Sequence, residues 1–232
     1  MNRKVFDYIF IACGLLIQVV TFLITLHLTP DTSDIMHHTS YISLLSGCLG
    51  VCSVCLASQG RILTFAFGFG QVITYAYLCW TQRFYGELAI NAYYFITMIY
   101  GVFVWRQNIR HQTSDITHQT TISPRRLTFP VAISMAIITL LVSWLVGWGL
   151  AAFTDDTQPY LDAFTTIPAL VAQVLMIMVF REHWFIWLAV DILSVILWLR
   201  AGDYCMTAQY VFWCANCIYG LHRWRSLGIS KV

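Results

Sequence analysis

The chain has 232 residues, of which 59% are hydrophobic and only 10% are charged, and its formal net charge at pH 7 is +2. So few charged side chains cannot cover a water-soluble surface, and the composition therefore excludes a soluble globular protein and predicts a polytopic protein in a lipid bilayer. The chain also lacks a basic patch interleaved with aromatic residues, and nucleic acid is not an expected partner.

Long apolar runs follow one another along the whole chain. A run of about 20 residues is long enough to cross a bilayer as a helix. The runs predict eight transmembrane helices, at residues 8–28, 41–58, 62–80, 88–105, 128–153, 160–180, 184–199 and 205–221. The first run has no small-residue cleavage site before residue 29 and is expected to be a retained helix rather than a signal peptide. The predicted fold class is an all-α polytopic membrane protein.

The basic residues predict the orientation of the chain. If the N-terminus is cytoplasmic, all of the 13 Lys and Arg residues except Arg83 and Arg200 fall in cytoplasmic segments. Lys and Arg concentrate in the cytoplasmic loops of membrane proteins. Both termini are therefore predicted to be cytoplasmic, which agrees with an even number of spans.

A repeat is visible when the chain is compared with itself. The segment IYGVFVWR at residues 99–106 returns as IYGLHRWR at residues 218–225, an offset of 119 residues, and Tyr41 and Tyr160 recur at the same offset. One inserted residue then aligns Gln71 with Asp191. The repeat predicts two parallel three-helix units. Both units begin outside and end inside, so helix 128–153 is expected to be a crossover helix that restores the direction.

The expected organisation has five parts. They are an extra N-terminal transmembrane helix with an outer loop (1–40), a first three-helix bundle (41–106), a cytoplasmic loop with the crossover helix (107–157), a second three-helix bundle (158–225) and a cytoplasmic tail (226–232). Symmetry of this type places a substrate site near the middle of the membrane.

Asp191 is the strongest functional clue in the sequence. It lies in the middle of the apolar run 183–199, where a lone carboxylate costs several kcal/mol unless it has a partner. Trp184 and Trp187 precede it by seven and four residues, so all three project from roughly one face of a helix. An anion beside aromatic rings suits an organic cation. For Trp184, a place in the aromatic belt at the membrane surface is the alternative.

Further polar and aromatic residues lie at matching depths. The alignment of Gln71 with Asp191 predicts a pocket with a neutral amide on one side and a carboxylate on the other. Asn91 and Tyr94 lie on one stripe of the third helix of the first unit, and Tyr210 and Trp213 lie on the corresponding stripe of the second unit. These residues are expected to bind substrate, and the alternative is that they join helices across the bilayer.

Other classes of protein are less favoured. Most of the eight cysteines lie in predicted spans, where cysteine behaves as a small apolar residue, and neither CxxC pair has a histidine nearby, so no metal and no cofactor are expected. The chain has no phosphate-binding loop and no series of intramembrane carboxylates or histidines, which favours passive movement of substrate. No G-x-S-x-G, HExxH or Ser/His pair at matched depth is present, and no catalytic residue is predicted.

Three segments resemble a known family. The segment EHWFIWLAVDILSVILWLRAGDY resembles the signature of the PnuC family of bacterial vitamin transporters, which carry WxxWxxxN or WxxWxxxD on this helix. Residues 85–105 and 160–176 are similar to the third helix of that family's first bundle and to the first helix of its second bundle. The resemblance, from about residue 41 to residue 224, implies a three-plus-one-plus-three bundle like that of the SWEET sugar transporters. It also implies facilitated diffusion of nicotinamide riboside across the bacterial inner membrane, with trapping by a cytoplasmic kinase.

The sequence leaves several alternatives open. Asp191 departs from the Asn form of the family pattern, and thiamine, another aromatic cation, is the alternative substrate. An intramembrane enzyme and a receptor without transport are less favoured. A homo-oligomer, the role of the extra helix and the order of gating are left open. The predicted substrate-binding residues are Trp184, Trp187, Asp191, Gln71, Asn91, Tyr94, Tyr210 and Trp213.

Overall fold

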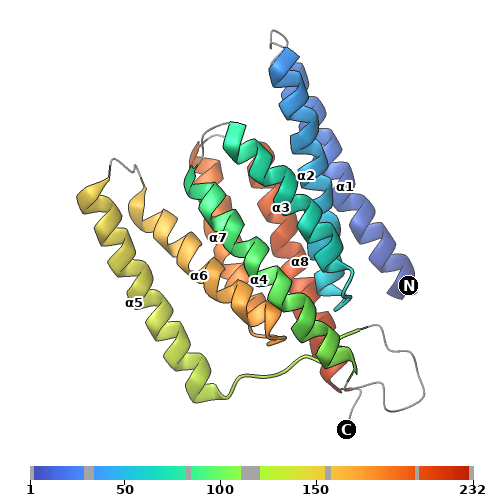
Figure 1. Ribbon diagram of the computed structural model, residues 1–232, viewed down its shortest axis with the longest axis vertical. Coiled ribbons are helices and arrows are strands. Elements are labelled where there is room, and N and C mark those ends of the chain that lie inside the picture. Colours follow the sequence, from blue (N-terminus) through green and yellow to red (C-terminus); the bar gives the residue numbers. More distant parts are fainter. Residues whose placement is uncertain are drawn as a thin grey trace. The chain divides into compact units, whose positions relative to one another are not determined.

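The computed structural model describes residues 3–28, 34–81, 85–110, 121–154, 158–201 and 204–229. These residues form eight α-helices (Figure 1): α1 Arg3–Leu28, α2 Asp34–Ser58, α3 Thr64–Thr81, α4 Tyr85–Arg110, α5 Phe129–Phe153, α6 Pro159–Ile177, α7 His183–Ala201 and α8 Tyr204–Ile229. The shortest, α3, has 18 residues and is about 27 Å long at the usual helical rise, close to the thickness of a bilayer's hydrocarbon core. The predicted all-α fold with eight helices is confirmed.

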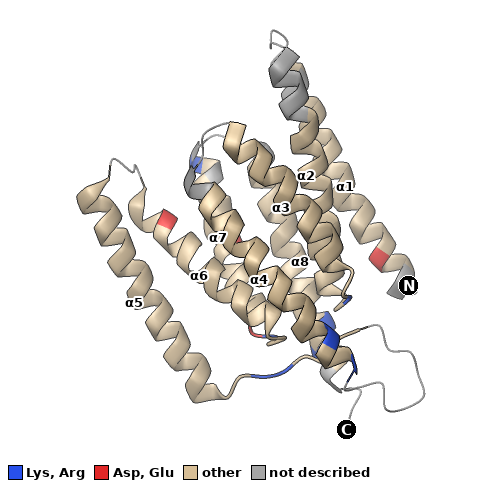
Figure 2. Cartoon of the chain, in the orientation of Figure 1, with Lys and Arg blue, Asp and Glu red and all other residues tan. Residues whose placement is uncertain are grey.

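Five of the described helices contain stretches that are long and apolar enough to cross a membrane. These stretches are Val5–Ile24, Tyr41–Ser58, Leu88–Arg110, Phe129–Phe153 and Pro159–Ile177, and α7 carries a shorter apolar stretch, His183–Leu197. Figure 2 shows that few of the described helical residues are charged. The chain is therefore a multi-pass membrane protein.

The chain divides into two compact units, residues 1–122 and 123–232. In the described part of the first unit, α1 packs against α2, α2 against α3 and α3 against α4; in that of the second, α5 packs against α6, α6 against α7 and α7 against α8. Each unit is thus a series of four helices in which every helix packs against its neighbours in sequence. The extra helix α1 has the same place in the first series that α5 has in the second.

In the first unit, α2 ends in a tight turn that returns the chain into α3. Gly60 has a φ angle of 70°, a left-handed conformation that glycine adopts without steric cost. The Gly60 N–H donates to the carbonyl oxygen of Ala57 at 2.9 Å, and the Arg61 N–H donates to that of Leu56 at 3.0 Å. These two bonds form the Schellman cap that ends many helices.

In the second unit, α6 ends in the same turn 119 residues later. The Val179 N–H donates to the carbonyl oxygen of Met176 at 3.0 Å, and the Phe180 N–H donates to that of Leu175 at 2.9 Å. Val179 has a φ angle of 64°, which is strained for a β-branched residue. The equal geometry of the two turns supports the predicted repeat.

The last residues before α5 form backbone hydrogen bonds with the turn of each unit. In the first unit, the Ile122 N–H donates to the carbonyl oxygen of Gly60 at 3.0 Å, and the Ile122 side chain is 1% exposed. In the second unit, the Arg125 N–H donates to the carbonyl oxygen of Val179 at 2.8 Å, and the Arg125 carbonyl oxygen accepts from the Arg181 N–H at 3.1 Å. The residues before α5 and the turns therefore lie at the same end of the helices within each unit.

Candidate functional site

Asp191 lies on α7 and is almost completely buried, with 3% of its surface exposed. The thiol of Cys217, on α8, donates a hydrogen bond to its Oδ2 atom, with a distance of 3.2 Å from Sγ to Oδ2. Among the residues that the structure describes, no Lys, Arg or His forms an ion pair with this carboxylate. Since an intramembrane carboxylate is costly without a cation, Asp191 is a candidate for a functional site.

Two predicted site residues on α8 contact each other. The rings of Tyr210 and Trp213 pack edge to face, with 4.9 Å between their centroids. Trp213 precedes Cys217 by one helical turn, so the two side chains share a face of α8. Within the described residues, the indole Nε1 of Trp213 is buried and has no hydrogen-bond partner. A buried donor without a partner costs about 1–3 kcal/mol, and this N–H is available to a ligand.

Trp184, at the start of α7, is packed among protein side chains. It is 4% exposed, and its ring centroid lies 4.5 Å from that of His183 and 5.8 Å from that of Trp224 on α8. Gly220 leaves the space for this ring, because a Cβ atom there would come within 2.7 Å of three ring atoms. The neighbours of Trp184 thus give it a packing role, and its binding of substrate stays a prediction.

Trp187 has a different environment from Trp184. It is half-buried and precedes Asp191 by one helical turn. Helix geometry places the Cα atom of Trp184 about 10 Å from that of Asp191 along the axis, but that of Trp187 only about 6 Å away. Trp187 is therefore the better placed of the two to act together with the carboxylate.

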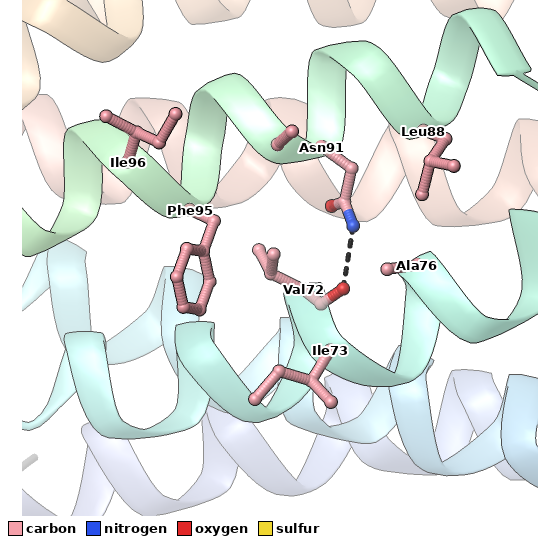
Figure 3. Close-up of a pocket in the computed structure, with 8 residues that line it drawn as sticks. Val72, Ile73, Ala76, Leu88, Asn91, Phe95 and Ile96 are labelled. Atoms are coloured by element: carbon pink, nitrogen blue, oxygen red, sulfur yellow. Dashed lines mark hydrogen bonds between the residues drawn. The ribbon is translucent and has the colours of Figure 1, made fainter.

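Asn91, in the first unit, joins two helices. It is 3% exposed, and its Nδ2 atom donates to the carbonyl oxygen of Val72 at 2.7 Å (Figure 3). The two residues border a groove of about 320 Å³ between α3 and α4, whose remaining lining is apolar: Ile73, Ala76, Leu88, Ala92, Phe95 and Ile96. The Asn91 nitrogen thus makes the helix-to-helix bond that was the alternative to substrate binding.

Gln71 and Tyr94, the other predicted residues of the first unit, are half-buried. A Cβ atom on Gly50 of α2 would lie 3.4 Å from the Cγ atom of Gln71, so the Gln71 side chain lies beside α2. The ring of Tyr94 lies 5.8 Å from that of Tyr93, its neighbour on α4. Gln71 therefore lies beside α2, whereas Asn91 donates to α3.

The structure corrects the alignment of the two units. Phe65 and Trp105 pack edge to face at 5.1 Å, as do Trp184 and Trp224 at 5.8 Å, and both members of the second pair lie 119 residues after those of the first. The two Schellman turns have the same offset. The inserted residue in the sequence alignment is therefore wrong, because the turn between α6 and α7 has the same length as the turn between α2 and α3. Val72, rather than Gln71, is the counterpart of Asp191.

Cys217 is the contact of Asp191 that sequence reasoning missed. The two residues are 26 positions apart on different helices, and the sequence alone predicts only a small apolar residue at Cys217. Its CxxC spacing with Cys214 gave no hint of a carboxylate partner. The fully buried His183, whose Nδ1 atom lies 2.7 Å from the carbonyl oxygen of Phe180, was also not singled out.

Long apolar helices, one of which carries a buried carboxylate, are typical of multi-pass membrane proteins, a class that includes small-molecule transporters. Comparison with known proteins gives the family. The family model described as nicotinamide mononucleotide transporter matches residues 40–226, and the chain belongs to this family.

Two relatives have the same name. The nicotinamide riboside transporter PnuC of Haemophilus influenzae is 28% identical over 226 residues, which cover 97% of this chain and 91% of the relative. The nicotinamide riboside transporter PnuC of Neisseria mucosa is also 28% identical, in an alignment 232 residues long that includes 96% of this chain and 81% of the relative. The family predicted from the sequence is confirmed.

A solved structure confirms the fold. The crystal structure of the vitamin B3 transporter PnuC superposes with a TM-score of 0.75 at 24% sequence identity, covering 98% of this chain and 93% of that one. So high a coverage leaves little of this chain unmatched, and helix α1 is therefore part of the shared fold. The family model, by contrast, begins after α1.

Proposed function

We propose that this protein carries nicotinamide riboside across the bacterial inner membrane by facilitated diffusion, with both termini in the cytoplasm. The observation that carries the proposal is the buried carboxylate of Asp191, which has a thiol partner and no ion pair among the described residues. Nicotinamide riboside has a pyridinium ring with one permanent positive charge, and it suits one carboxylate with aromatic neighbours. The names of the relatives support this substrate.

The description of the family names the mononucleotide, but the charge of the proposed site favours the riboside. A mononucleotide carries a phosphate, and that phosphate would enter a site whose one described ionisable acid is Asp191. Two like charges about 6 Å apart repel each other by roughly 3 kcal/mol at an effective dielectric constant of about 20. The riboside lacks this repulsion and keeps the attraction of its ring for the carboxylate.

The proposed roles of the residues follow from their surroundings. Asp191 pairs with the pyridinium ring, and Trp187 stacks on it. The Nε1 donor of Trp213, which has no partner among the described residues, binds a ribose hydroxyl or the carboxamide oxygen. The Tyr210 ring supports that of Trp213. The proposed contacts to the polar part of the substrate from the first unit are Gln71, Asn91 and Tyr94.

Passive transport agrees with the chain's chemistry. The sequence has no phosphate-binding loop for nucleotide hydrolysis and no series of intramembrane acids that resembles a proton relay. Movement without an energy source runs down the electrochemical gradient of the riboside and stops when that gradient is gone. A cytoplasmic kinase that phosphorylates the riboside would keep the gradient directed inward, and the phosphate would prevent the product's return.

Uptake into proteoliposomes of purified protein tests the proposal. Labelled nicotinamide riboside, nicotinamide mononucleotide and thiamine are each offered without an ion gradient. We expect saturable uptake of the riboside, competition by its unlabelled form, and little uptake of the mononucleotide. Saturable uptake of thiamine alone would replace the substrate and keep the mechanism. Uptake that needs a proton or sodium gradient would overturn passive transport.

Two substitutions test the site. Asp191→Ala is expected to reduce riboside uptake at least tenfold, since loss of an ion pair in a desolvated site costs well over 1.4 kcal/mol. Asp162→Asn, at the first turn of α6, removes a different carboxylate and is the matched control, with uptake close to that of the wild type. Unchanged uptake by Asp191→Ala would contradict the assignment of the site.

A further inference from the structure

The contact between Cys217 and Asp191 joins two buried side chains on neighbouring helices. Cys217 is 4% exposed and Asp191 is 3% exposed, and helices α7 and α8 pack directly against each other. The Sγ atom lies 3.2 Å from Oδ2, which is hydrogen-bonding distance for sulfur. Among the described residues, this thiol is the hydrogen-bond donor to the carboxylate.

The chemistry of a thiol suits a supporting role at a binding carboxylate. A carboxylate offers about four lone-pair positions, and a thiol is a weak donor that fills one of them. The contact therefore restricts the orientation of the carboxylate while most of its capacity remains for a cation. A basic partner would instead neutralise the charge and compete directly with a cationic substrate.

We propose that Cys217 is a positioning residue for substrate binding, which holds the Oδ2 atom of Asp191 and so keeps the carboxylate in its binding orientation. The inference rests on the proposed function, because it requires Asp191 to bind the substrate. A group that is already oriented loses less entropy when the ligand arrives. The contribution of Cys217 therefore appears in substrate affinity and leaves the rate of the conformational cycle unchanged.

Control variants can distinguish this positioning role from simple packing. Cys79 on α3 is also buried, with 1% of its surface exposed, and it provides a control of equal size in a different place. If Cys217 only fills space, removal of either sulfur has a similar effect on uptake. If Cys217 orients Asp191, the hydroxyl group of Cys217→Ser can replace the thiol as hydrogen-bond donor, whereas the methyl group of Cys217→Ala cannot.

The experiment compares Cys217→Ala, Cys217→Ser, Cys79→Ala and Asp191→Ala in proteoliposomes, with the KM and Vmax for labelled nicotinamide riboside and the unfolding temperature of each variant. Loss of one hydrogen bond of about 1 kcal/mol raises KM by about fivefold. We expect this rise for Cys217→Ala with Vmax within about twofold of the wild type. We expect KM values near that of the wild type for Cys217→Ser and Cys79→Ala, and the largest loss for Asp191→Ala.

Each other outcome contradicts a specific statement. A normal KM for Cys217→Ala beside a strong defect in Asp191→Ala overturns the positioning role and leaves the proposed function in place. An equal loss of affinity in Cys217→Ala and Cys217→Ser, or in Cys217→Ala and Cys79→Ala, shows packing alone and also overturns it. Normal uptake by Asp191→Ala overturns both the proposed site and the role of Cys217.

Discussion

The close contact between Gly220 and Trp184 leads to a quantitative prediction for Gly220→Ala. A Cβ atom at position 220 would lie 2.5–2.7 Å from three atoms of the Trp184 ring, far inside van der Waals contact. The ring has no free space to move into, because it is 4% exposed and packs against His183 and Trp224. The variant therefore forces α7 and α8 apart or moves the ring from its position.

The magnitude follows from two opposing contributions. Overpacking of a dense core costs about 1–3 kcal/mol, and replacement of a helical glycine by alanine returns about 1 kcal/mol. Gly149→Ala on α5 is the matched control, because its added Cβ would have no described atom within 4 Å apart from its chain neighbours and the local backbone of its own helix. The propensity gain is common to both variants, so their unfolding free energies should differ by about 1–3 kcal/mol.

Thermal unfolding in detergent, followed by intrinsic tryptophan fluorescence, measures this difference. At about 2–4 °C per kcal/mol for a chain of this size, Gly220→Ala should unfold about 2–12 °C below Gly149→Ala. The second change Trp184→Phe removes the atoms that clash and should recover part of the loss in the double variant. Equal unfolding temperatures for the two alanine variants would refute the packing argument.

Two further predictions use the same assay. Gly60→Ala should destabilise the protein by about 1 kcal/mol, since a side chain in the left-handed conformation costs about 1–2 kcal/mol and the stiffer unfolded chain returns part of this; an unchanged unfolding temperature would mean that the turn tolerates a side chain as it tolerates Val179. Asn91→Ala should cost only about 0.6 kcal/mol, as is usual for hydrogen bonds between helices in bilayers. The proposed substrate contact of Asn91 predicts, in addition, a raised KM of this variant for the riboside. An unchanged KM would leave Asn91 with the bond to Val72 alone.

The sequence predicted the helices and the family because both depend on local patterns. Apolar runs long enough for a bilayer have few alternatives to a helix, and the recurrence of IYG and WR at one offset identified Trp105 and Trp224 as counterparts. In the structure both tryptophans are completely buried, each against an aromatic ring of the preceding helix. The predicted arrangement of two parallel three-helix repeats stays a prediction that these pairs support.

The sequence did not predict which side chains meet across helices. The sequence alignment pairs Gln71 with Asp191 through one inserted residue, whereas the two turns, at an offset of 119 residues, pair Asp191 with the apolar Val72. Spacing along one helix likewise placed Trp184 and Asp191 on one face but could not show that α8 covers the tryptophan. The partner of Asp191 comes from another helix, and no local pattern indicates such a pair.

The packing of each described helix against its neighbours in sequence has a consequence for biosynthesis. Within each unit, the contacts of a helix are made with the helix just before it or just after it. Contacts that are close in sequence form early and quickly, and chains fold from the N-terminus as they are synthesised. Each helix can therefore dock on its predecessor as soon as it enters the bilayer, without waiting for the rest of the chain. Truncated chains that end after α2, α3 or α4 should accordingly retain the helix pairs already made.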